Sequence, residues 1–151
     1  MRLLSIAAAL ALITACESVP ADPSAPSEIR HYVKDAYKEA GFPFSSAVDA
    51  DGWVFLAGEL GTTPDTGLVL GGIGPETRQT MDNIQATLEA NGLGWDNVVK
   101  CTVFLADIAE WPAFNDVYKT YFDGTYPARS ALGASGLALG ARVEIECIAK
   151  R

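Results

Sequence analysis

Short apolar runs bounded by glycine, proline and polar residues recur along the chain from residue 29 onward, and they predict a sheet. Residues 53–57 form one such run, closed by a glycine, which predicts a buried strand. Residues 98–106 alternate between apolar and polar side chains, which predicts a strand with one buried face. The side chains expected on that face are Val99, Cys101, Val103 and Leu105. Residues 128–132 and 142–148 predict the last two strands.

Two segments between these strands repeat their apolar residues at helical spacing. In the first, Pro75 and Glu76 suit a helix start, and Asn91 with Gly92 suits its end. The stripe expected to face the sheet is Thr77, Met81, Ile84 and Leu88. The second helix carries a stripe made of Trp111, Phe114, Val117 or Tyr118, and Tyr121. Residues 29–40 fit either a strand or a helix. The order of elements predicts an α+β domain, a mixed sheet with two helices packed on one face.

The first 28 residues differ in pattern from the rest and predict an export signal followed by a tether. Residues 1–15 combine a basic start with an apolar run about half as long as the roughly 20 residues that a membrane-spanning helix needs. The sequence ITAC, which ends at Cys16, resembles the bacterial lipobox, in which the cysteine becomes the lipid-bearing N-terminus. Residues 16–28 are rich in proline and serine and predict an extended tether.

These patterns predict a folded domain at residues 29–151 that works in the bacterial cell envelope. We expect it to face the periplasm and to be held to a membrane only through the lipid on Cys16. An ordinary secretory signal, which would leave the protein free in the periplasm, is the alternative.

Composition limits the size of the protein and its partners. A chain of 151 residues is the usual length of one domain. Eleven Lys and Arg against 19 Asp and Glu give a formal net charge of −8 with no basic run, so no nucleic-acid partner is expected. Cys101 and Cys147 lie in two predicted strands without a metal-binding or redox spacing. We interpret them as buried, unpaired thiols in preference to a disulfide.

Few residues indicate chemistry by themselves. The glycine-rich stretches match neither phosphate-binding fingerprint, so nucleotide binding is not expected. His31 is the only histidine, and a single imidazole without suitably spaced partners predicts a surface residue. Arg129 and Glu144, in the last two strands, are more informative because a buried guanidinium needs an anionic partner. Taken alone, the two residues favour a structural salt bridge, and a bound carboxylate is the alternative.

Seven separated segments resemble the reactive-intermediate deaminase family, RidA, also called YjgF, in the order in which that family has them. The segments are FPFSSAV (42–48), VFLAGELG (54–61), TRQTMDNIQATLEANG (77–92), VVKCTVFLAD (98–107), FNDVYKTYF (114–122), YPARS (126–130) and VEIECIA (143–149). The resemblance implies a fold like that of trimeric chorismate mutase. It also implies a homotrimer around a barrel-like centre, with three active sites in the clefts between subunits.

The resemblance further implies a hydrolase that converts reactive 2-imino or enamine acids, such as 2-iminobutanoate and 2-iminopropanoate, into 2-keto acids and ammonia. No metal and no cofactor are implied. Arg129 matches the family's arginine that binds the substrate carboxylate, and Glu144 matches the glutamate that activates water. The family match overrides the salt-bridge interpretation. A non-catalytic trimer that binds small carboxylates or a protein partner in the same clefts is the alternative.

Five further residues are candidates for substrate binding by the same resemblance, namely Phe44, Ala57, Gly58, Asn115 and Ala131. Some positions depart from the family pattern. The departures are Phe44 for a tyrosine, Ala57 for a serine, Glu59 for a glutamine and Ala131 for a cysteine. We therefore expect a less polar pocket wall, to which Glu59 adds a charge. A ribonuclease activity, which has been reported in the family, is disfavoured by the charge and by the export signal.

Overall fold

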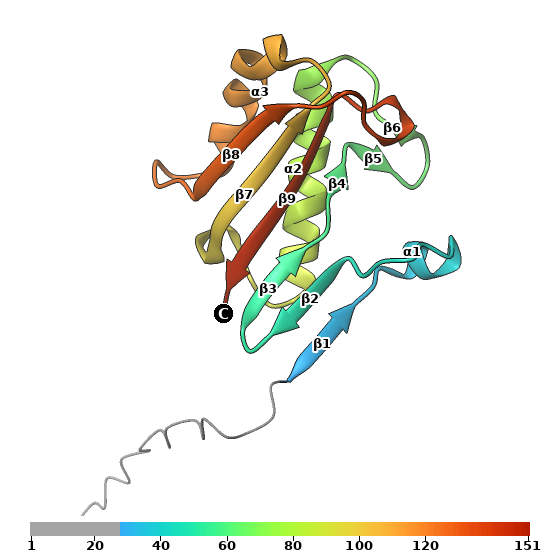
Figure 1. The fold of residues 1–151 in the computed structure, drawn as a ribbon, viewed down its shortest axis with the longest axis vertical. Coiled ribbons are helices and arrows are strands. Elements are labelled where there is room, and N and C mark those ends of the chain that lie inside the picture. Colours follow the sequence, from blue (N-terminus) through green and yellow to red (C-terminus); the bar gives the residue numbers. More distant parts are fainter. Residues whose placement is uncertain (1–27) are drawn as a thin grey trace, which may run out of the picture.

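The computed structural model describes residues 28–151. The predicted signal, the predicted lipidation site Cys16 and nearly all of the predicted tether lie outside these residues. The described chain forms one mixed sheet, a separate small hairpin and two long helices, with the order of elements that the sequence predicts (Figure 1). Within residues 28–151, no helix has the length and the apolar run needed to cross a membrane.

The sheet runs in the order β1-β2-β3-β9-β7-β8, and β4 pairs with β9 beside β3. Its strands are β1 (Ile29–Tyr32), β2 (Ala47–Ala50), β3 (Trp53–Leu56), β4 (Glu59–Leu60), β7 (Val98–Leu105), β8 (Ala128–Gly133) and β9 (Val143–Lys150). The pair β7 and β8 is parallel and the other pairs are antiparallel. The hairpin consists of β5 (Thr62–Thr63) and β6 (Gly67–Leu68).

The long helices α2 (Ile73–Ala90) and α3 (Trp111–Tyr118) cover one face of the sheet, as predicted (Figure 1). The stripe predicted for the first helix is buried along α2, which packs on β4 and β9 and against α3. In α3 the predicted stripe is buried at Phe114, Val117 and Tyr118, but Trp111, at the start of the helix, is 37% exposed. The shorter helices are α1 (Asp35–Glu39) and four 3₁₀ turns, η1 (Trp95–Asn97), η2 (Ile108–Glu110), η3 (Lys119–Tyr121) and η4 (Ala138–Gly140).

Two local expectations need correction or completion. The segment 29–40, which fitted either a strand or a helix, contains both, because β1 ends at Tyr32 and α1 begins at Asp35. Val99 does not share the buried face of β7, since its exposed fraction is 43%. A register shift between Val98 and Lys100 interrupts the alternation there and buries Val98 instead.

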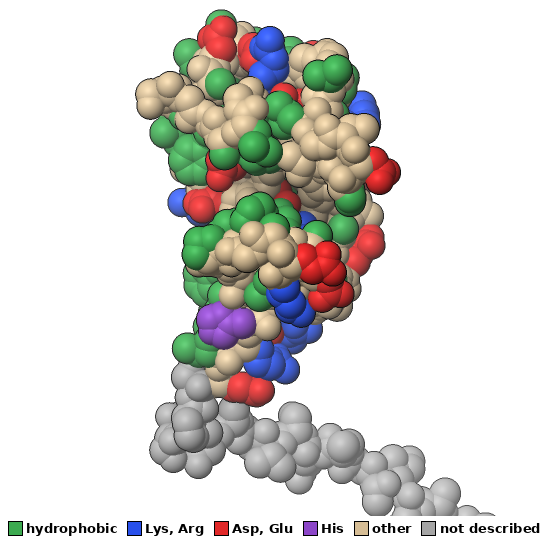
Figure 2. All heavy atoms as spheres, turned by 90° about the vertical axis from the view of Figure 1, so that its right-hand side faces the viewer, with side chains coloured by type: hydrophobic (Ala, Val, Ile, Leu, Met, Phe, Trp, Pro, Cys, Tyr) green, Lys and Arg blue, Asp and Glu red, His purple; other side chains and the backbone are tan. Residues whose placement is uncertain are grey.

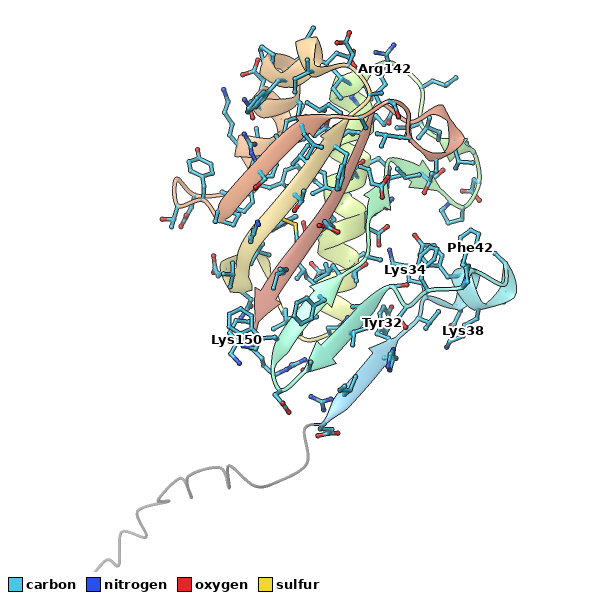
Figure 3. All side chains as sticks on the ribbon, in the orientation of Figure 1. Tyr32, Lys34, Lys38, Phe42, Arg142 and Lys150 are labelled. Atoms are coloured by element: carbon cyan, nitrogen blue, oxygen red, sulfur yellow. A yellow bond between two sulfur atoms is a disulfide. The ribbon has the colours of Figure 1, made fainter. Side chains whose placement is uncertain are left out.

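Cys101 and Cys147 form a disulfide, which corrects the prediction of two unpaired thiols (Figure 3). The two residues face each other directly across β7 and β9, with 4.1 Å between their Cα atoms, and both are buried. The alternation along each strand correctly predicts burial, but pairing depends on the register between strands, which alternation does not specify.

Removal of this disulfide should lower the free energy of unfolding. A variant with both Cys101→Ala and Cys147→Ala should lose about 2 to 4 kcal/mol, because the unfolded chain is no longer constrained by a closed loop. Urea unfolding of the variant and of the oxidised wild type, followed by tryptophan fluorescence, measures the difference. Equal urea midpoints would contradict the assignment of a stabilising cross-link.

Candidate active site

Arg129 lies on the edge strand β8 and points to the helix-covered side of the sheet. Arg129 is paired with the buried Cys101 in the parallel register of β7 and β8. Paired residues of neighbouring strands point to the same face of a sheet, so Arg129 shares the face of Cys101. The guanidinium packs under α3, with its Cζ atom 4.6 Å from the ring centroid of Tyr118 and 5.5 Å from that of Phe114. Among residues 28–151, Arg129 takes part in no ion pair, so the structural salt bridge with Glu144 is absent.

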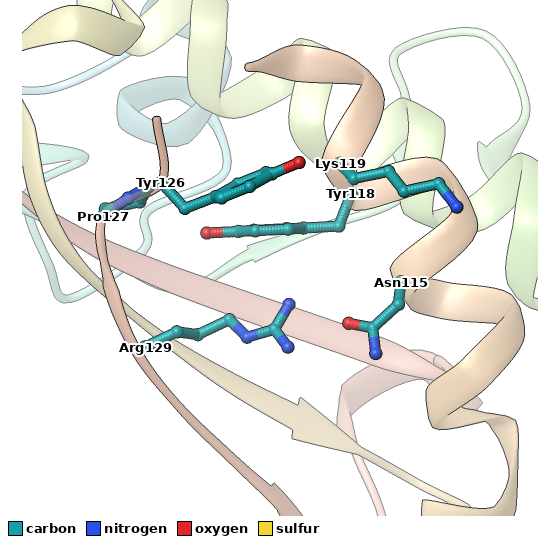
Figure 4. A pocket seen from close by; sticks show the side chains of 6 residues that line it. All are labelled: Asn115, Tyr118, Lys119, Tyr126, Pro127 and Arg129. Atoms are coloured by element: carbon teal, nitrogen blue, oxygen red, sulfur yellow. The ribbon is translucent and has the colours of Figure 1, made fainter. Parts of the chain in front are cut away.

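A cavity of about 400 Å³, the arginine cavity, opens beside this guanidinium. Its lining residues are Asn115, Tyr118, Lys119, Tyr126, Pro127 and Arg129. Figure 4 shows the guanidinium and the amide of Asn115 pointing toward one another beneath the ring of Tyr118. Lys119 is paired with Asp116 at 2.8 Å, which leaves the guanidinium of Arg129 to attract an anion. Burial raises the pKa of Tyr118 to about 12, so its hydroxyl stays neutral near pH 7.

Glu144 lies on the opposite, open face of the sheet. Residues 143, 145 and 147 of β9 are buried toward the helices, and the alternation turns Glu144 and Glu146 away from them. Gly58 approaches Glu144 so closely that a Cβ atom at position 58 would collide with its carboxylate. Burial raises the pKa of Glu144, and the charge of Glu146 on the same face raises it further. A carboxylate with a raised pKa is suited to general acid and base catalysis.

A second cavity of about 610 Å³, the aromatic cavity, is lined in part by Gly58. Its walls are α1 with the loop that follows it, the hairpin β5-β6 and the turn η4, and they carry Tyr37, Phe42, Phe44, Pro64 and Leu139. Figure 2 shows a hollow on this face of the molecule, above a rim of apolar side chains. Phe44 and Gly58, two of the predicted substrate-binding residues, therefore line the same cavity.

Glu59 does not add a free charge to this cavity, which corrects the expectation from the sequence. Its carboxylate is buried, with an exposed fraction of 1%, and pairs with the ammonium group of Lys34 at 2.6 Å. The hydroxyls of Tyr37 and Thr87 also donate hydrogen bonds to it, each at 3.2 Å. Nothing in the spacing of the sequence indicates this network, because Lys34 and Thr87 belong to segments that only the fold brings together.

The predicted site residues therefore form two groups in one chain. Asn115 of α3 and Arg129 of β8 line the arginine cavity, and Ala131, two residues after Arg129 on β8, is half-buried against the core. Glu144 lies on the opposite face of the sheet against Gly58, and Gly58 and Phe44 line the aromatic cavity. Ala57 precedes Gly58, and its amide donates a hydrogen bond to the carbonyl of Ser46. Neither cavity contains residues of both groups.

Comparison with known proteins identifies the family. Residues 33–151 match the family model described as Endoribonuclease L-PSP, and the chain belongs to this family, which includes RidA. The 2-iminobutanoate/2-iminopropanoate deaminase of Capra hircus is 45% identical over 82% of this chain and 91% of its own. The human deaminase of the same name is 42% identical over 71% of this chain and 79% of its own.

Solved structures agree with this assignment. The structure of the yeast protein YEO7 is 36% identical, with a TM-score of 0.76, and the match covers 82% of this chain and 99% of the yeast chain. The structure of TdcF from E. coli with bound serine is 34% identical, with a TM-score of 0.69, over 72% of this chain and 88% of that one. The predicted α+β fold of the RidA type is thereby confirmed.

Proposed function

We propose that the protein hydrolyses reactive 2-imino or enamine acids to 2-keto acids and ammonia. The observation that carries the proposal is the guanidinium of Arg129, which borders an open cavity and takes part in no ion pair among residues 28–151. Such a group binds a carboxylate through two charge-assisted hydrogen bonds. The names of the mammalian relatives supply the class of reaction.

In this mechanism Arg129 binds the substrate carboxylate, and Glu144 acts as the general base and then as the general acid. Glu144 takes a proton from water while the water oxygen bonds to the imine carbon and the C=N electron pair moves to nitrogen. Glu144 then gives this proton to the nitrogen of the carbinolamine. The substrate reacts as its protonated iminium, so this third proton converts the nitrogen into an ammonium group. The C–N bond then breaks, its electron pair leaves with ammonia, and the hydroxyl proton passes to Glu144 as the keto group forms. One water is consumed for each ammonia released.

The two groups of site residues support a trimer in which each active site combines Arg129 of one subunit with Glu144 of its neighbour. A shared site gives a role to both groups, since in one chain Arg129 and Glu144 lie on opposite faces of the sheet. The open face of the sheet also exposes Trp53, Phe55 and Leu132, whose exposed fractions are 43%, 47% and 44%. Large apolar side chains gathered on one face are typical of protein interfaces. We expect light scattering to give the mass of three chains.

The direct test uses the soluble domain and freshly generated 2-iminopropanoate. Release of pyruvate and ammonia above the rate without protein supports the proposal. An unchanged rate at micromolar protein would contradict it, and binding of pyruvate without turnover would favour the non-catalytic alternative.

The pH dependence of hydrolysis should show the raised pKa of Glu144. A general base works only when ionised, so kcat/KM should fall as the pH decreases through a value above the ordinary 4.5 of glutamate. Glu146→Gln removes the neighbouring negative charge and should move this acid limb to lower pH. The measurement is kcat/KM against pH for both proteins. A limb that stays in place or moves to higher pH contradicts the assignment.

Gly58→Ala should disable Glu144 without unfolding the protein. The added Cβ collides with the carboxylate of Glu144, and a displacement of about 1 Å lowers a rate by about 10²-fold. Gly94→Ala is the matched control, because a Cβ at position 94 meets nothing within 4 Å. Thermal unfolding should show that both variants fold. Wild-type activity in Gly58→Ala would place the working carboxylate elsewhere.

We also propose that the protein works in the cell envelope, anchored through lipid on Cys16. The disulfide between Cys101 and Cys147 supports this address, since disulfides persist in oxidising compartments. Mass spectrometry of the N-terminal peptide from membrane fractions tests the anchor. A peptide that begins at Met1, or an unmodified Cys16, contradicts it.

A further inference from the structure

Three aromatic rings form a connected wall in the aromatic cavity. Phe42 and Phe44 are stacked, with ring centroids 5.5 Å apart. Tyr37 makes a T-shaped contact with each of them, at centroid distances of 5.1 Å and 5.7 Å. Phe42 and Phe44 remain about half exposed, at 49% and 46%. The rings therefore offer apolar surface to whatever enters the cavity, and they favour an apolar or aromatic group.

The charged and amide side chains that line the same cavity already have partners within the chain. Lys34 and Glu59 pair with each other, and the hydroxyl of Tyr37 donates to Glu59. The amide of Asn83 donates to the carbonyls of Leu60 and Thr62 and accepts from Gln79. A polar group entering the cavity would lose water without gaining these partners, which makes its binding unfavourable.

The cavity also adjoins the proposed reaction centre. Gly58 lines it, and the same glycine is in close approach to the carboxylate of Glu144. A substrate whose imine carbon lies beside the water held by Glu144 can therefore extend its side chain past Gly58. The volume of about 610 Å³ is larger than a methyl or ethyl group requires.

We infer that the aromatic cavity receives the substrate's side chain and that the preferred substrates are 2-imino acids with a large apolar side chain, branched or aromatic. This inference rests on the proposed function and gives it a substrate class. It differs from the small 2-imino acids in the names of the mammalian relatives. Leu139, from η4, also lines the cavity and adds an apolar side chain to it.

The test compares the imino acids made in situ from alanine, leucine and phenylalanine by an amino-acid oxidase. Release of each keto acid is measured with the rate without the tested protein subtracted. The side chains of the leucine and phenylalanine imines bury several more carbon atoms in the cavity than the methyl group of 2-iminopropanoate does. We therefore expect kcat/KM for these two imines to be at least about tenfold higher than for 2-iminopropanoate. Equal or lower values overturn the inference but leave the proposed function intact, provided that 2-iminopropanoate is hydrolysed and Arg129→Ala removes this activity.

Paired variants locate the preference. Leu139→Asn places a polar side chain at the rim, and asparagine accepts the backbone φ of 60° at this position. Phe42→Asn does the same within the ring wall. Both should lower the ratio of kcat/KM for large over small substrates toward one. Leu70→Asn is the control, since Leu70 is 90% exposed and lies outside the cavity, and it should keep the wild-type ratio. An unchanged ratio in both cavity variants would overturn the assignment of the cavity.

Discussion

Arg129→Ala should lower kcat/KM for 2-iminopropanoate hydrolysis by about 10²- to 10³-fold. The estimate corresponds to the loss of two charge-assisted hydrogen bonds to the substrate carboxylate. Arg129→Lys should recover only part of this loss, because an ammonium group keeps the charge but not the planar fork. The fold should persist, since the guanidinium takes part in no ion pair within residues 28–151. Steady-state kinetics and thermal unfolding of both variants measure these effects.

Arg30→Ala is a suitable control for the removal of one positive charge. Arg30 pairs with Asp49 at 3.0 Å on β1 and β2, far along the sheet order from β8. We expect this variant to keep kcat/KM within about threefold of the wild type, in line with the small effects of surface substitutions. If Arg129→Ala retains the activity of Arg30→Ala, Arg129 does not bind the substrate. Glu144→Gln that still binds pyruvate but has lost turnover separates catalysis from binding.

Two inactive variants should restore activity when they are expressed together. If Arg129 and Glu144 of each site come from neighbouring subunits, random mixing of Arg129→Ala and Glu144→Gln chains leaves about one quarter of the sites with both groups intact. The expected activity is therefore about a quarter of the wild type. Each variant alone should stay at background. Kinetics on the co-purified mixed oligomers, with the chain ratio measured by mass spectrometry, check the result.

A second mixture provides an independent count. Chains that carry both substitutions, mixed equally with wild-type chains, give about one quarter of intact shared sites but about one half if each chain holds a whole site. Background activity in the first mixture, together with one half in the second, would show that Arg129 and Glu144 act within one chain. Such a result would contradict the shared site, which the positions of Arg129 and Glu144 on opposite faces of the sheet support.

The positions of helices and strands could be predicted from local patterns. The stripe of Thr77, Met81, Ile84 and Leu88 correctly predicted the buried face of α2. An amphipathic helix can bury its apolar side chains only by turning that one face toward the sheet. The apolar run in residues 142–148 likewise predicted β9 as a strand, and in the structure its alternation turns Glu144 away from the helices. These predictions depend only on neighbours within a few residues, and they hold where the backbone is regular.

Features that depend on register or on distant segments could not be predicted. The bulge at Val99 and the pairing of Cys101 with Cys147 both follow from how β7 aligns with β9. The ion pair of Lys34 with Glu59 joins residues 25 positions apart. The resemblance named Arg129 and Glu144 as partners, but only the three-dimensional arrangement shows that in one chain they lie on opposite faces of the sheet.

The burial of the cross-strand disulfide has a consequence for the order of events during folding. Both sulfur-bearing residues are covered, with exposed fractions of 1% and 2%, so an oxidant cannot reach them once the helices have packed. Oxidation must therefore come before closure of the core. A chain that folds in a reducing compartment would keep two buried thiols. A chain that crosses a membrane unfolded would meet the oxidant before its core closes, so the disulfide could form.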